Sequence, residues 1–262
     1  MIKPIRKIHQ FLIDKPISEG EMLNQRYQVL DMIGAGSYGM VYLCHDLNDQ
    51  VNKVLKQLRP SKRKSKKEIK LFHDEVSILS NLNHHHMPKL HEVFSDQGHY
   101  FYVMDYIDGV NLEDEIFRNK KTFNERESLQ FVAQIIKLVE YLHKRNIFHL
   151  DLRIPNILVK NNEPYLIDFG LAQQIASSAK LEGQNREEMK LQDYYDLGDI
   201  LLYLLYTTYS SKTKKALPWT EELFLRKETV LLLEKLLKID EPYTSIDEIL
   251  HDLHLAIQAF RE

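Results

Sequence analysis

The sequence predicts an α+β fold of two lobes: an N-terminal antiparallel β-sheet that carries one helix, followed by a mainly helical C-terminal part. From Tyr27 to Leu58, short apolar segments at strand-like spacing alternate with turn-prone segments, a pattern typical of antiparallel strands. Beyond Ser128, apolar residues recur every three or four positions, as in helices that pack along one face. The 262 residues are enough for one large domain or for two lobes that share a cleft.

The first half of the chain predicts a small sheet with one inserted helix. Residues 1–26 mix charges with scattered apolar side chains, and we interpret them as an extension packed on the first lobe. The segments expected to form strands are 27–34, 39–47, 51–58, 89–96 and 99–107. Residues 66–82 change to helical periodicity, and their apolar face is expected to comprise Ile69, Phe72, Val76, Leu79 and Leu82.

The second half of the chain is predicted to be mainly helical. Helices are expected at 128–145, 193–207, 228–238 and 245–260. The boundary between the lobes is expected near Asp105–Gly109, where an apolar strand ends in an Asp-Gly turn signal. We therefore divide the chain into an extension at 1–26, an N-lobe at 27–106 and a C-lobe at 107–262.

The composition argues against several classes of protein. A net charge of -3 gives no reason to expect nucleic acid or an anionic membrane surface as the main partner. Cys44 is the single cysteine, which excludes an intramolecular disulfide and fits a reducing compartment. We find neither the apolar core of a signal peptide nor the roughly 18 apolar residues of a membrane span. A cytoplasmic protein is therefore expected.

Two runs of polar residues are assigned mainly structural roles. The basic segment from Arg59 to Lys70 is typical of a solvated loop and helix start, with a docking patch as the alternative. His84, His85 and His86 only weakly suggest a metal site, because no cysteine or second histidine cluster in the sequence is placed to complete it.

A glycine-rich segment, IGAGSYGMVY, covers residues 33–42. Its glycines let the main chain approach a polyphosphate, and Val41 can cover an adenine ring. A dinucleotide-binding turn is the rival interpretation, but such a turn opens a helix, whereas this chain continues as a strand. We therefore expect a β-hairpin that covers a nucleotide. The nucleotide-contacting residues expected in it are Ile33, Gly34, Ala35, Gly36, Ser37, Tyr38, Gly39, Met40 and Val41.

Widely separated polar residues follow this hairpin in a characteristic order. They are Lys56 in a strand, Glu75 in the inserted helix, Asp151 and Asn156 in HLDLRIPN, and Asp168 in IDFG. Together with the glycine-rich hairpin, this order resembles the protein kinase superfamily over nearly the whole chain beyond its extension. The resemblance implies a bilobal kinase fold, ATP and Mg²⁺ as cofactors, and a protein as substrate.

The resemblance implies a nucleotide-binding set in the N-lobe. Lys56 would pair with the α- and β-phosphates, and Glu75 would hold Lys56. Lys53 is a weaker alternative to Lys56, because strand alternation turns the two lysines in opposite directions. Met104 would close the rear of the adenine pocket. The remaining adenine contacts are expected from the main chain of Asp105 and Ile107 and from the side chains of Val41, Val54 and Leu158.

The resemblance also implies a catalytic and metal-binding set in the C-lobe. Asp151 would accept the proton of the substrate hydroxyl or orient that group, and Arg153 would contact the γ-phosphate where many kinases carry lysine. Asn156 and Asp168 would hold Mg²⁺ through hard oxygen ligands. Phe169 and His149 would join Leu79 in an apolar stack that ties the lobes.

The chain departs from the family pattern in three ways. Leu150 replaces the arginine that commonly pairs with an activation-loop phosphate, so phosphorylation switching at Ser177 or Ser178 is not expected. Asp193, the expected anchoring aspartate, comes only twenty-five positions after Asp168, and no A-P-E motif lies between them. Tyr243 stands where kinases carry the arginine that pairs with the A-P-E glutamate, so both halves of that ion pair are absent.

These observations favour an ATP- and Mg²⁺-dependent serine/threonine protein kinase of the compact bacterial type. A kinase-like small-molecule phosphotransferase is the first alternative, because that group also lacks A-P-E. A pseudokinase that binds nucleotide without turnover is the second, although no catalytic residue is missing from the sequence. The identity of the phosphate acceptor separates the first two interpretations.

Overall fold

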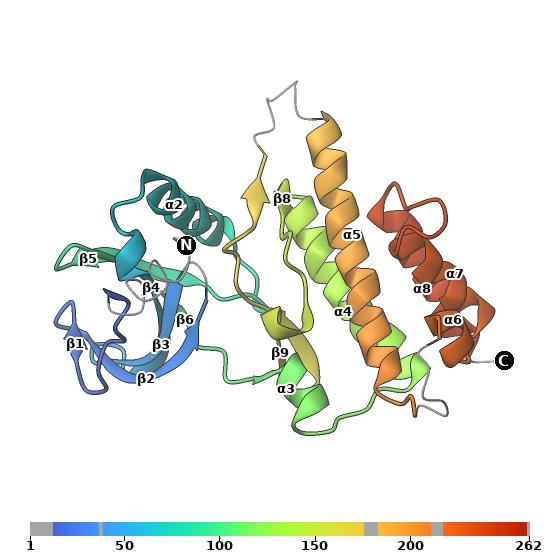
Figure 1. Ribbon diagram of the computed structural model, residues 1–262, viewed down its shortest axis with the longest axis horizontal. Coiled ribbons are helices and arrows are strands. Elements are labelled where there is room, and N and C mark those ends of the chain that lie inside the picture. The colour runs from blue at the N-terminus through green and yellow to red at the C-terminus, as the bar shows by residue number, and fades with distance from the viewer. Residues whose placement is uncertain (1–12, 37–38, 176–182, 211–216, 261–262) are drawn as a thin grey trace, which may run out of the picture. The chain divides into compact units, whose positions relative to one another are not determined.

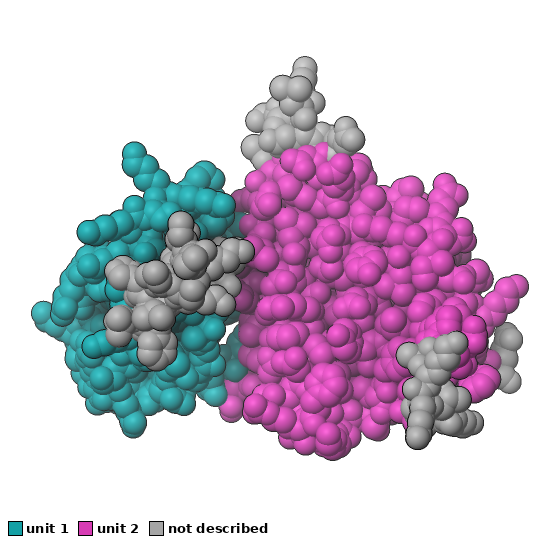
Figure 2. All heavy atoms as spheres, viewed as in Figure 1, with its two compact units in different colours: residues 1–107 teal, residues 108–262 magenta. Residues whose placement is uncertain are grey.

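The computed structural model describes residues 13–36, 39–175, 183–210 and 217–260. Its contacts divide the chain into two compact units, residues 1–107 and 108–262 (Figure 2). We call them unit 1 and unit 2 and describe each by itself. Within the described residues, no helix is long and apolar enough to cross a membrane.

Unit 1 is built on a six-stranded antiparallel sheet with the order β1-β2-β3-β4-β6-β5 (Figure 1). The strands are β1 (Met22–Leu23), β2 (Tyr27–Ala35), β3 (Gly39–Asp46), β4 (Val51–Leu58), β5 (Leu90–Asp96) and β6 (His99–Asp105). A short 3₁₀ helix, η1 (Pro60–Lys62), and one α-helix, α2 (Lys66–Asn81), connect β4 to β5. The predicted antiparallel sheet with one inserted helix is confirmed.

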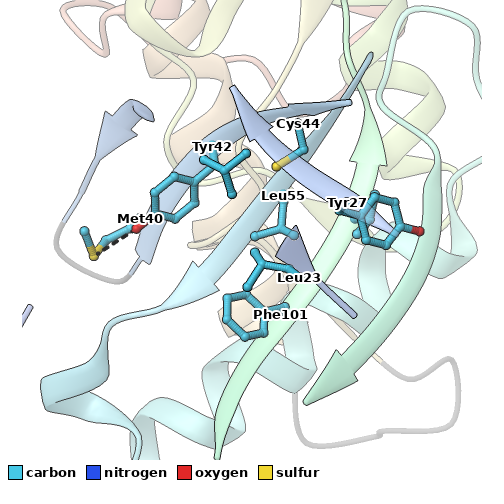
Figure 3. Close-up of a cluster of buried hydrophobic side chains, with 9 residues drawn as sticks. Leu23, Tyr27, Met40, Tyr42, Cys44, Leu55 and Phe101 are labelled. Carbon is cyan, nitrogen blue, oxygen red and sulfur yellow. Dashed lines mark hydrogen bonds between the residues drawn. The ribbon is translucent and has the colours of Figure 1, made fainter. Parts of the chain in front are cut away.

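Alternate residues of the strands form the core on one face of this sheet (Figure 3). Tyr42 and Cys44 in β3 are fully buried, and so is Leu55 in β4, as expected when every second side chain of a strand points to the same face. Burial raises the pKa of the Cys44 thiol to about 12. Cys44 therefore behaves as a small apolar core residue rather than as a reactive thiol.

Helix α2 begins where the sequence provides an N-cap. The Ser65 side chain accepts a hydrogen bond from the Glu68 N–H at the helix start, which satisfies one of the unpaired donors of the first turn. The residues that α2 buries are Phe72, Glu75, Ile78 and Leu79. The predicted apolar face was wrong at Ile69 and Val76, which are only half-buried, because Glu75 occupies the buried position between Phe72 and Ile78.

Unit 2 is mainly helical, as predicted. Its helices are α3 (Leu112–Phe117), α4 (Glu125–His143), the 3₁₀ helix η2 (Ile154–Asn156), α5 (Gly183–Tyr206), α6 (Trp219–Glu222), α7 (Lys227–Leu236) and α8 (Ile246–Gln258). Its short strands are β7 (Val110–Asn111), β8 (Ile147–Phe148), β9 (Ile157–Lys160), β10 (Glu163–Leu166) and β11 (Gln173–Gln174). They form two small sheets, β10-β9-β7 and β11-β8.

The helices of unit 2 pack around α4 and α5 (Figure 1). Helix α4 begins with a capping box between Asn124 and Glu127 and contacts both α5 and α8. Helix α5 packs closely on α7 at Gly198, where an added Cβ would lie 2.8 Å from Leu236 Cβ. Glycine is therefore required at this crossing of two helices.

The start of α5 corrects one sequence-based expectation. The apolar pattern predicted a helix from Asp193, but α5 begins at Gly183. Residues 183–192 are mostly polar and largely solvent-exposed where described, so they carry no apolar periodicity to indicate a helix. The non-helical part of the segment between Asp168 and Asp193 is accordingly shorter than the sequence suggested.

Candidate active site

The glycine-rich segment of unit 1 joins β2 to β3 as an antiparallel hairpin, with Gly34 paired to Val41 and Ala35 to Met40. The Gly36 N–H donates to the Gly39 carbonyl across the hairpin at 3.0 Å. This arrangement differs from a dinucleotide-binding turn, in which the glycines open a helix. The predicted contact residues Ser37 and Tyr38 lie outside the described residues.

Close packing fixes one end of this hairpin against the neighbouring strand. A Cβ at Gly39 would lie 3.0 Å from the Gln57 carbonyl oxygen and 3.1 Å from Lys56 Cε, so only glycine fits without displacing β4. Met40 is buried in the sheet core with 2% of its surface exposed. Of the predicted contact residues, Met40 therefore offers a nucleotide its main chain rather than its side chain.

The Lys56 ammonium is held by a carboxylate from the inserted helix. Lys56 Nζ lies 2.6 Å from Glu75 Oε1, and the Tyr102 hydroxyl donates to the same oxygen at 2.9 Å. Both members of the ion pair are buried, so solvent screens the interaction less than at a surface. The structure thus brings together the two residues that the sequence paired across nineteen positions.

Lys53 takes a different partner, as strand alternation predicts. Its Nζ lies 3.4 Å from Asp105 Oδ1 and 2.8 Å from His91 Nε2, at the end of β6. Burial raises the pKa of Asp105, but hydrogen bonds from His91 and the Lys89 N–H outweigh it and lower that pKa overall. The Lys53 ammonium is therefore committed to the carboxylate of Asp105.

The chain segment after Met104 was expected to provide main-chain groups to an adenine. The Asp105 N–H already donates to the Lys89 carbonyl at 3.0 Å, so the carbonyl of Asp105 is the main-chain group it can offer. Met104 and Ile107 are half-buried. Val54 is 7% exposed, in the strand beside Val41.

In unit 2, Asp151 and Asn156 are joined within one tight loop. Asn156 Nδ2 donates to the Asp151 carbonyl at 2.9 Å and to Asp151 Oδ2 at 2.8 Å. Because Nδ2 is used in this way, Asn156 Oδ1 remains the available ligand atom of the amide. Arg153 Nε lies 3.4 Å from Asp151 Oδ1, so the Asp151 carboxylate has a cation beside it.

The hairpin β9–β10 returns the chain to this loop. Leu158 lies in β9 and pairs with Tyr165 of β10, and the Ile167 N–H then donates to the Asn156 carbonyl at 3.0 Å. Asp168 follows immediately, with φ 61°, and its Oδ1 accepts from the Gly170 N–H at 3.3 Å. A left-handed conformation is uncommon for a non-glycine residue and is concentrated at functional sites. The main-chain hydrogen bond between Ile167 and Asn156 thus brings the backbones of the two predicted metal ligands, Asn156 and Asp168, next to each other.

A buried carboxylate beneath the loop clamps its main chain. Asp193 in α5 is fully buried; its Oδ1 accepts from the Leu150 N–H at 2.8 Å, and its Oδ2 from the His149 N–H at 3.1 Å. His143 Nε2 lies 2.7 Å from the same Oδ2. Leu150 has φ 61°, and the Asp193 clamp holds it there. The sequence-predicted anchoring aspartate therefore holds the main chain of the loop that precedes Asp151.

Burial keeps the His149 imidazole neutral. Burial lowers the pKa of His149, more than the nearby Asp193, Asp168 and Asp151 raise it. Its ring packs on Phe169 with 5.1 Å between centroids. His149 and Phe169 therefore form the apolar contact that the sequence predicted within this unit.

Asp196 was missed by sequence reasoning. Its Oδ2 accepts from the Leu152 N–H at 3.2 Å, and its Oδ1 from Gln192 Nε2 at 2.7 Å. Burial raises the pKa of Asp196 to about 6, with Asp193 and Asp151 adding to the effect. Its spacing of three residues from Asp193 on one helix was the signal available in the sequence, since such residues share a face.

The comparison with known families identifies the family of the chain. The protein kinase domain family matches residues 27–214, which include every site residue described above. The chain belongs to the protein kinase family. The bilobal kinase fold inferred from the motifs is confirmed, and the chain is a protein kinase enzyme.

Similar kinases come from bacteria and from eukaryotes. The "Probable serine/threonine-protein kinase YbdM" of Bacillus subtilis (strain 168) is 42% identical over 258 residues, covering 97% of this chain and 98% of that protein. Calcium-dependent protein kinase 4 of Plasmodium falciparum is 35% identical over 62% of this chain and 31% of its own length. Human NUAK family SNF1-like kinase 2 is 33% identical over 57% and 24%, respectively.

Where the family carries an ion pair, this kinase has a different, partly buried network. Tyr243 is 2% exposed, and its hydroxyl donates to Asp252 Oδ2 at 2.8 Å. Lys235 Nζ lies 2.9 Å from the same oxygen. At the position where the family carries an arginine, this chain therefore has a tyrosine whose hydroxyl is hydrogen-bonded.

The histidine run of the kinase forms a cluster of rings, in which His84 and His85 are stacked and His86 lies edge-on to both. The centroids of His84 and His85 are 4.8 Å apart, and those of His85 and His86 are 4.3 Å apart. Among the residues that the structure describes, no group of three or more His, Cys, Asp or Glu side chains is arranged to hold a metal ion. Ser177 and Ser178 lie outside the described residues.

Proposed function

We propose that this kinase transfers the γ-phosphoryl group of ATP to a serine or threonine hydroxyl of a protein, with Mg²⁺ bound beside the phosphates. The observation that carries the proposal is the Asp151–Asn156 hydrogen bond, because it orders a carboxylate for the acceptor and turns an amide oxygen towards a metal. The 42% identity with a full-length relative whose name specifies serine/threonine supports the acceptor type.

Unit 1 supplies the nucleotide-binding groups in this proposal. The hairpin main chain of Ile33–Val41 covers the phosphates, and Lys56, oriented by Glu75 at 2.6 Å, neutralises the α- and β-phosphates. Val41 and Val54 contact the adenine ring, and Leu158 of unit 2 is proposed to do the same. The Asp105 carbonyl and the Ile107 main chain bind the adenine edge, and Met104 closes the rear of its pocket.

The donor set of unit 2 fits Mg²⁺. Asn156 Oδ1 is available because Nδ2 is used on Asp151, and the carboxylate of Asp168 is solvent-exposed. Mg²⁺ prefers such oxygen ligands and is commonly held by one or two side chains together with phosphates and water. When bound, it would neutralise charge that develops on the transferred phosphoryl group.

The remaining residues act on the acceptor. The Asp151 carboxylate orients the substrate hydroxyl and takes its proton as the new oxygen–phosphorus bond forms and the bond to the β-phosphate oxygen breaks. Arg153, beside Asp151 at 3.4 Å, provides a planar cation for the γ-phosphate oxygens. Positioning and electrostatics account for most of the catalysis in phosphoryl transfer.

A small-molecule acceptor is the second candidate, and one observation favours it. Helix α5 begins at Gly183, which leaves little chain after Gly170 for the platform that would hold a protein substrate. The two candidates share the ATP and Mg²⁺ chemistry and differ only in what presents the hydroxyl. The acceptor assay therefore decides between them.

The test is incubation of the purified kinase with γ-labelled ATP and Mg²⁺, with and without a generic protein acceptor. The controls are Asp151→Asn, which keeps the side-chain shape, and chelation of the metal. Label on serine or threonine that disappears in both controls is the expected result. Label only on a small hydroxylated acceptor would replace the protein-substrate proposal, and nucleotide binding without any transfer would favour the pseudokinase.

A further inference from the structure

A carboxylate from the N-terminal extension is buried against the end of β4. Asp14 has a side chain only 5% exposed. It accepts from the Ser61 N–H at 2.8 Å, from the Ser61 hydroxyl at 3.0 Å and from Arg59 Nη1 at 3.0 Å. Three donors saturate much of the accepting capacity of one carboxylate. Asp14 is thus a structured contact of the extension.

Arg59 carries this contact to the glycine-rich hairpin. While its Nη1 donates to Asp14, its Nε donates to the Gly36 carbonyl at 2.6 Å. A planar guanidinium with several fixed donors can hold two acceptors at once. Arg59 comes three positions after Lys56, at the end of the strand against which Gly39 packs.

Gly36 depends on polar contacts to hold its position. A Cβ built at Gly36 meets no heavy atom within 4 Å, and glycine has more backbone freedom than other residues. Its N–H is fixed by Gly39 within the hairpin, and its carbonyl is fixed by Arg59. Asp14 restricts the rotamers of Arg59 through a charge-assisted hydrogen bond. The extension therefore controls the second of the two contacts that order Gly36.

We propose that Asp14 and Arg59 are positioning residues that preorganise the glycine-rich hairpin for nucleotide binding. This inference rests on the proposed function, in which the hairpin covers ATP phosphates. A hairpin already ordered in the free protein loses less conformational entropy when it binds. Asp14 thus influences the ATP site through Arg59, without itself contacting the nucleotide.

The extension has other attachments that keep it in place when Asp14 is changed. The Gly20 N–H donates to the Val29 carbonyl at 2.8 Å, and the Val29 N–H donates to the Glu21 carbonyl at 2.9 Å. The Ile17 N–H donates to the Tyr42 hydroxyl at 3.2 Å. A substitution at Asp14 therefore removes the link to Arg59 while the rest of the segment remains attached to the sheet.

The experiment compares Asp14→Asn, Asp14→Ala, Arg59→Lys and Arg59→Ala with the wild type. Glu19→Ala is the matched control, because Glu19 is an exposed acid in the same segment. The KM for ATP is expected to rise about three- to tenfold in the alanine variants, with kcat changed by less than about twofold. The double variant Asp14→Ala/Arg59→Ala should have the same KM for ATP as Arg59→Ala alone, since both substitutions break the same link between Asp14, Arg59 and Gly36.

Two further readouts do not depend on turnover. Binding of a non-hydrolysable ATP analogue with Mg²⁺ should weaken by the same factor as the KM rises. Hydrogen exchange at the hairpin amides should accelerate in Asp14→Ala, and it should remain unchanged in Glu19→Ala. Thermal unfolding of every variant is measured in parallel. If the alanine variants fold poorly, the same assays are applied to Asp14→Asn and Arg59→Lys instead.

The outcomes separate this inference from the proposed function. A wild-type protein that binds no nucleotide would contradict the proposed function itself. A wild type that binds and transfers phosphate, with unchanged KM and unchanged hairpin exchange in the Asp14 and Arg59 variants, would overturn the positioning role alone. A loss of kcat without a change in KM would do the same.

Discussion

Unit 1 and unit 2 hold their functional side chains in different ways. In unit 1, Lys56 is fixed by a partner side chain: the Lys56 and Glu75 side chains are 10% and 6% exposed and lie 2.6 Å apart. In unit 2, the Asp151 and Arg153 side chains are 27% and 58% exposed. Their loop is fixed from below, through the main-chain N–H groups that Asp193 accepts.

The difference fits the role that we propose for each group. A lysine that neutralises phosphates must be aimed before the ligand arrives, and a buried carboxylate provides this at the cost of desolvating two charges. A carboxylate that meets an incoming hydroxyl must stay open to the substrate, so its backbone is clamped instead. In unit 1, a substitution of the functional side chain should therefore lower both activity and stability. In unit 2, loss of stability is expected mainly from substitution of the buried residue that holds the loop.

The largest expected effect is on catalysis. Lys56→Ala and Asp168→Ala should each lower phosphoryl transfer by at least about 100-fold, because each removes a charge that the proposed function places on the phosphates or the metal. Lys56→Ala should also lower the thermal stability, since it leaves the buried Glu75 without its cation. Labelled-ATP turnover and calorimetric unfolding measure the two effects. Full activity in either variant would contradict the assignment of that residue.

The next largest effect is on stability and concerns the clamp. Both oxygens of Asp193 accept N–H groups, so Asp193→Asn places an amide N–H₂ against a donor in a fully buried site. We expect the free energy of unfolding to fall by about 3 kcal/mol, measured by urea denaturation. Asp196→Asn is the matched control, because the Gln192 amide beside it can reverse its orientation to pair with the new group. Equal losses in both variants would refute the special role of Asp193.

A smaller effect should distinguish two glycines of one hairpin. Gly39→Ala forces a Cβ to 3.0 Å from the Gln57 carbonyl and 3.1 Å from Lys56 Cε, which should cost about 1–3 kcal/mol as overpacking and raise the KM for ATP. Gly36→Ala meets no such contact and should be milder in both respects. The same urea and steady-state assays apply. A Gly36 variant that is the more damaging of the two would show that packing on β4 does not order the hairpin.

The smallest effect is a pH dependence at Asp196. Burial raises the pKa of this carboxyl from 3.8 to about 6, so the folded protein binds its proton more tightly than the unfolded chain does. Raising the pH from about 4 to about 6 therefore removes stability, and the loss is complete above that range. In Asp196→Asn this loss should be absent, so the stability of the variant should rise relative to that of the wild type as the pH increases from about 4 to about 6. Urea unfolding at several pH values measures it, and parallel curves for the two proteins would contradict it.

Much of unit 1 could be predicted from the sequence, because its patterns are local. Strand alternation indicated β2, β3 and β4, and helical spacing indicated α2. The same alternation separated Lys56 from Lys53 before their partners were known. The prediction failed at Ile69 and Val76, because apolar periodicity does not show that a carboxylate, Glu75, occupies the most buried face of its helix.

In unit 2 the sequence indicated the candidate functional residues better than it indicated the contacts that hold them. The motifs of the catalytic loop named Asp151, Asn156 and Asp168, and the helical motif named Asp193. The polar first turns of α5 carried no apolar signal, and Asp196 was not singled out. Its role depends on a hydrogen bond to Leu152, forty-four positions earlier, which no local pattern records.

By itself, the sequence determined that this chain is a two-lobed kinase and which side chains are the candidates for its chemistry, because motif spacing and periodicity are properties of the chain. Only the tertiary structure decided how those side chains are held. The clamp of Asp193, the Tyr243–Asp252–Lys235 network and the Asp14–Arg59–Gly36 link all join residues distant in sequence. Their energies arise from burial and hydrogen-bond geometry, which exist only once the chain has folded.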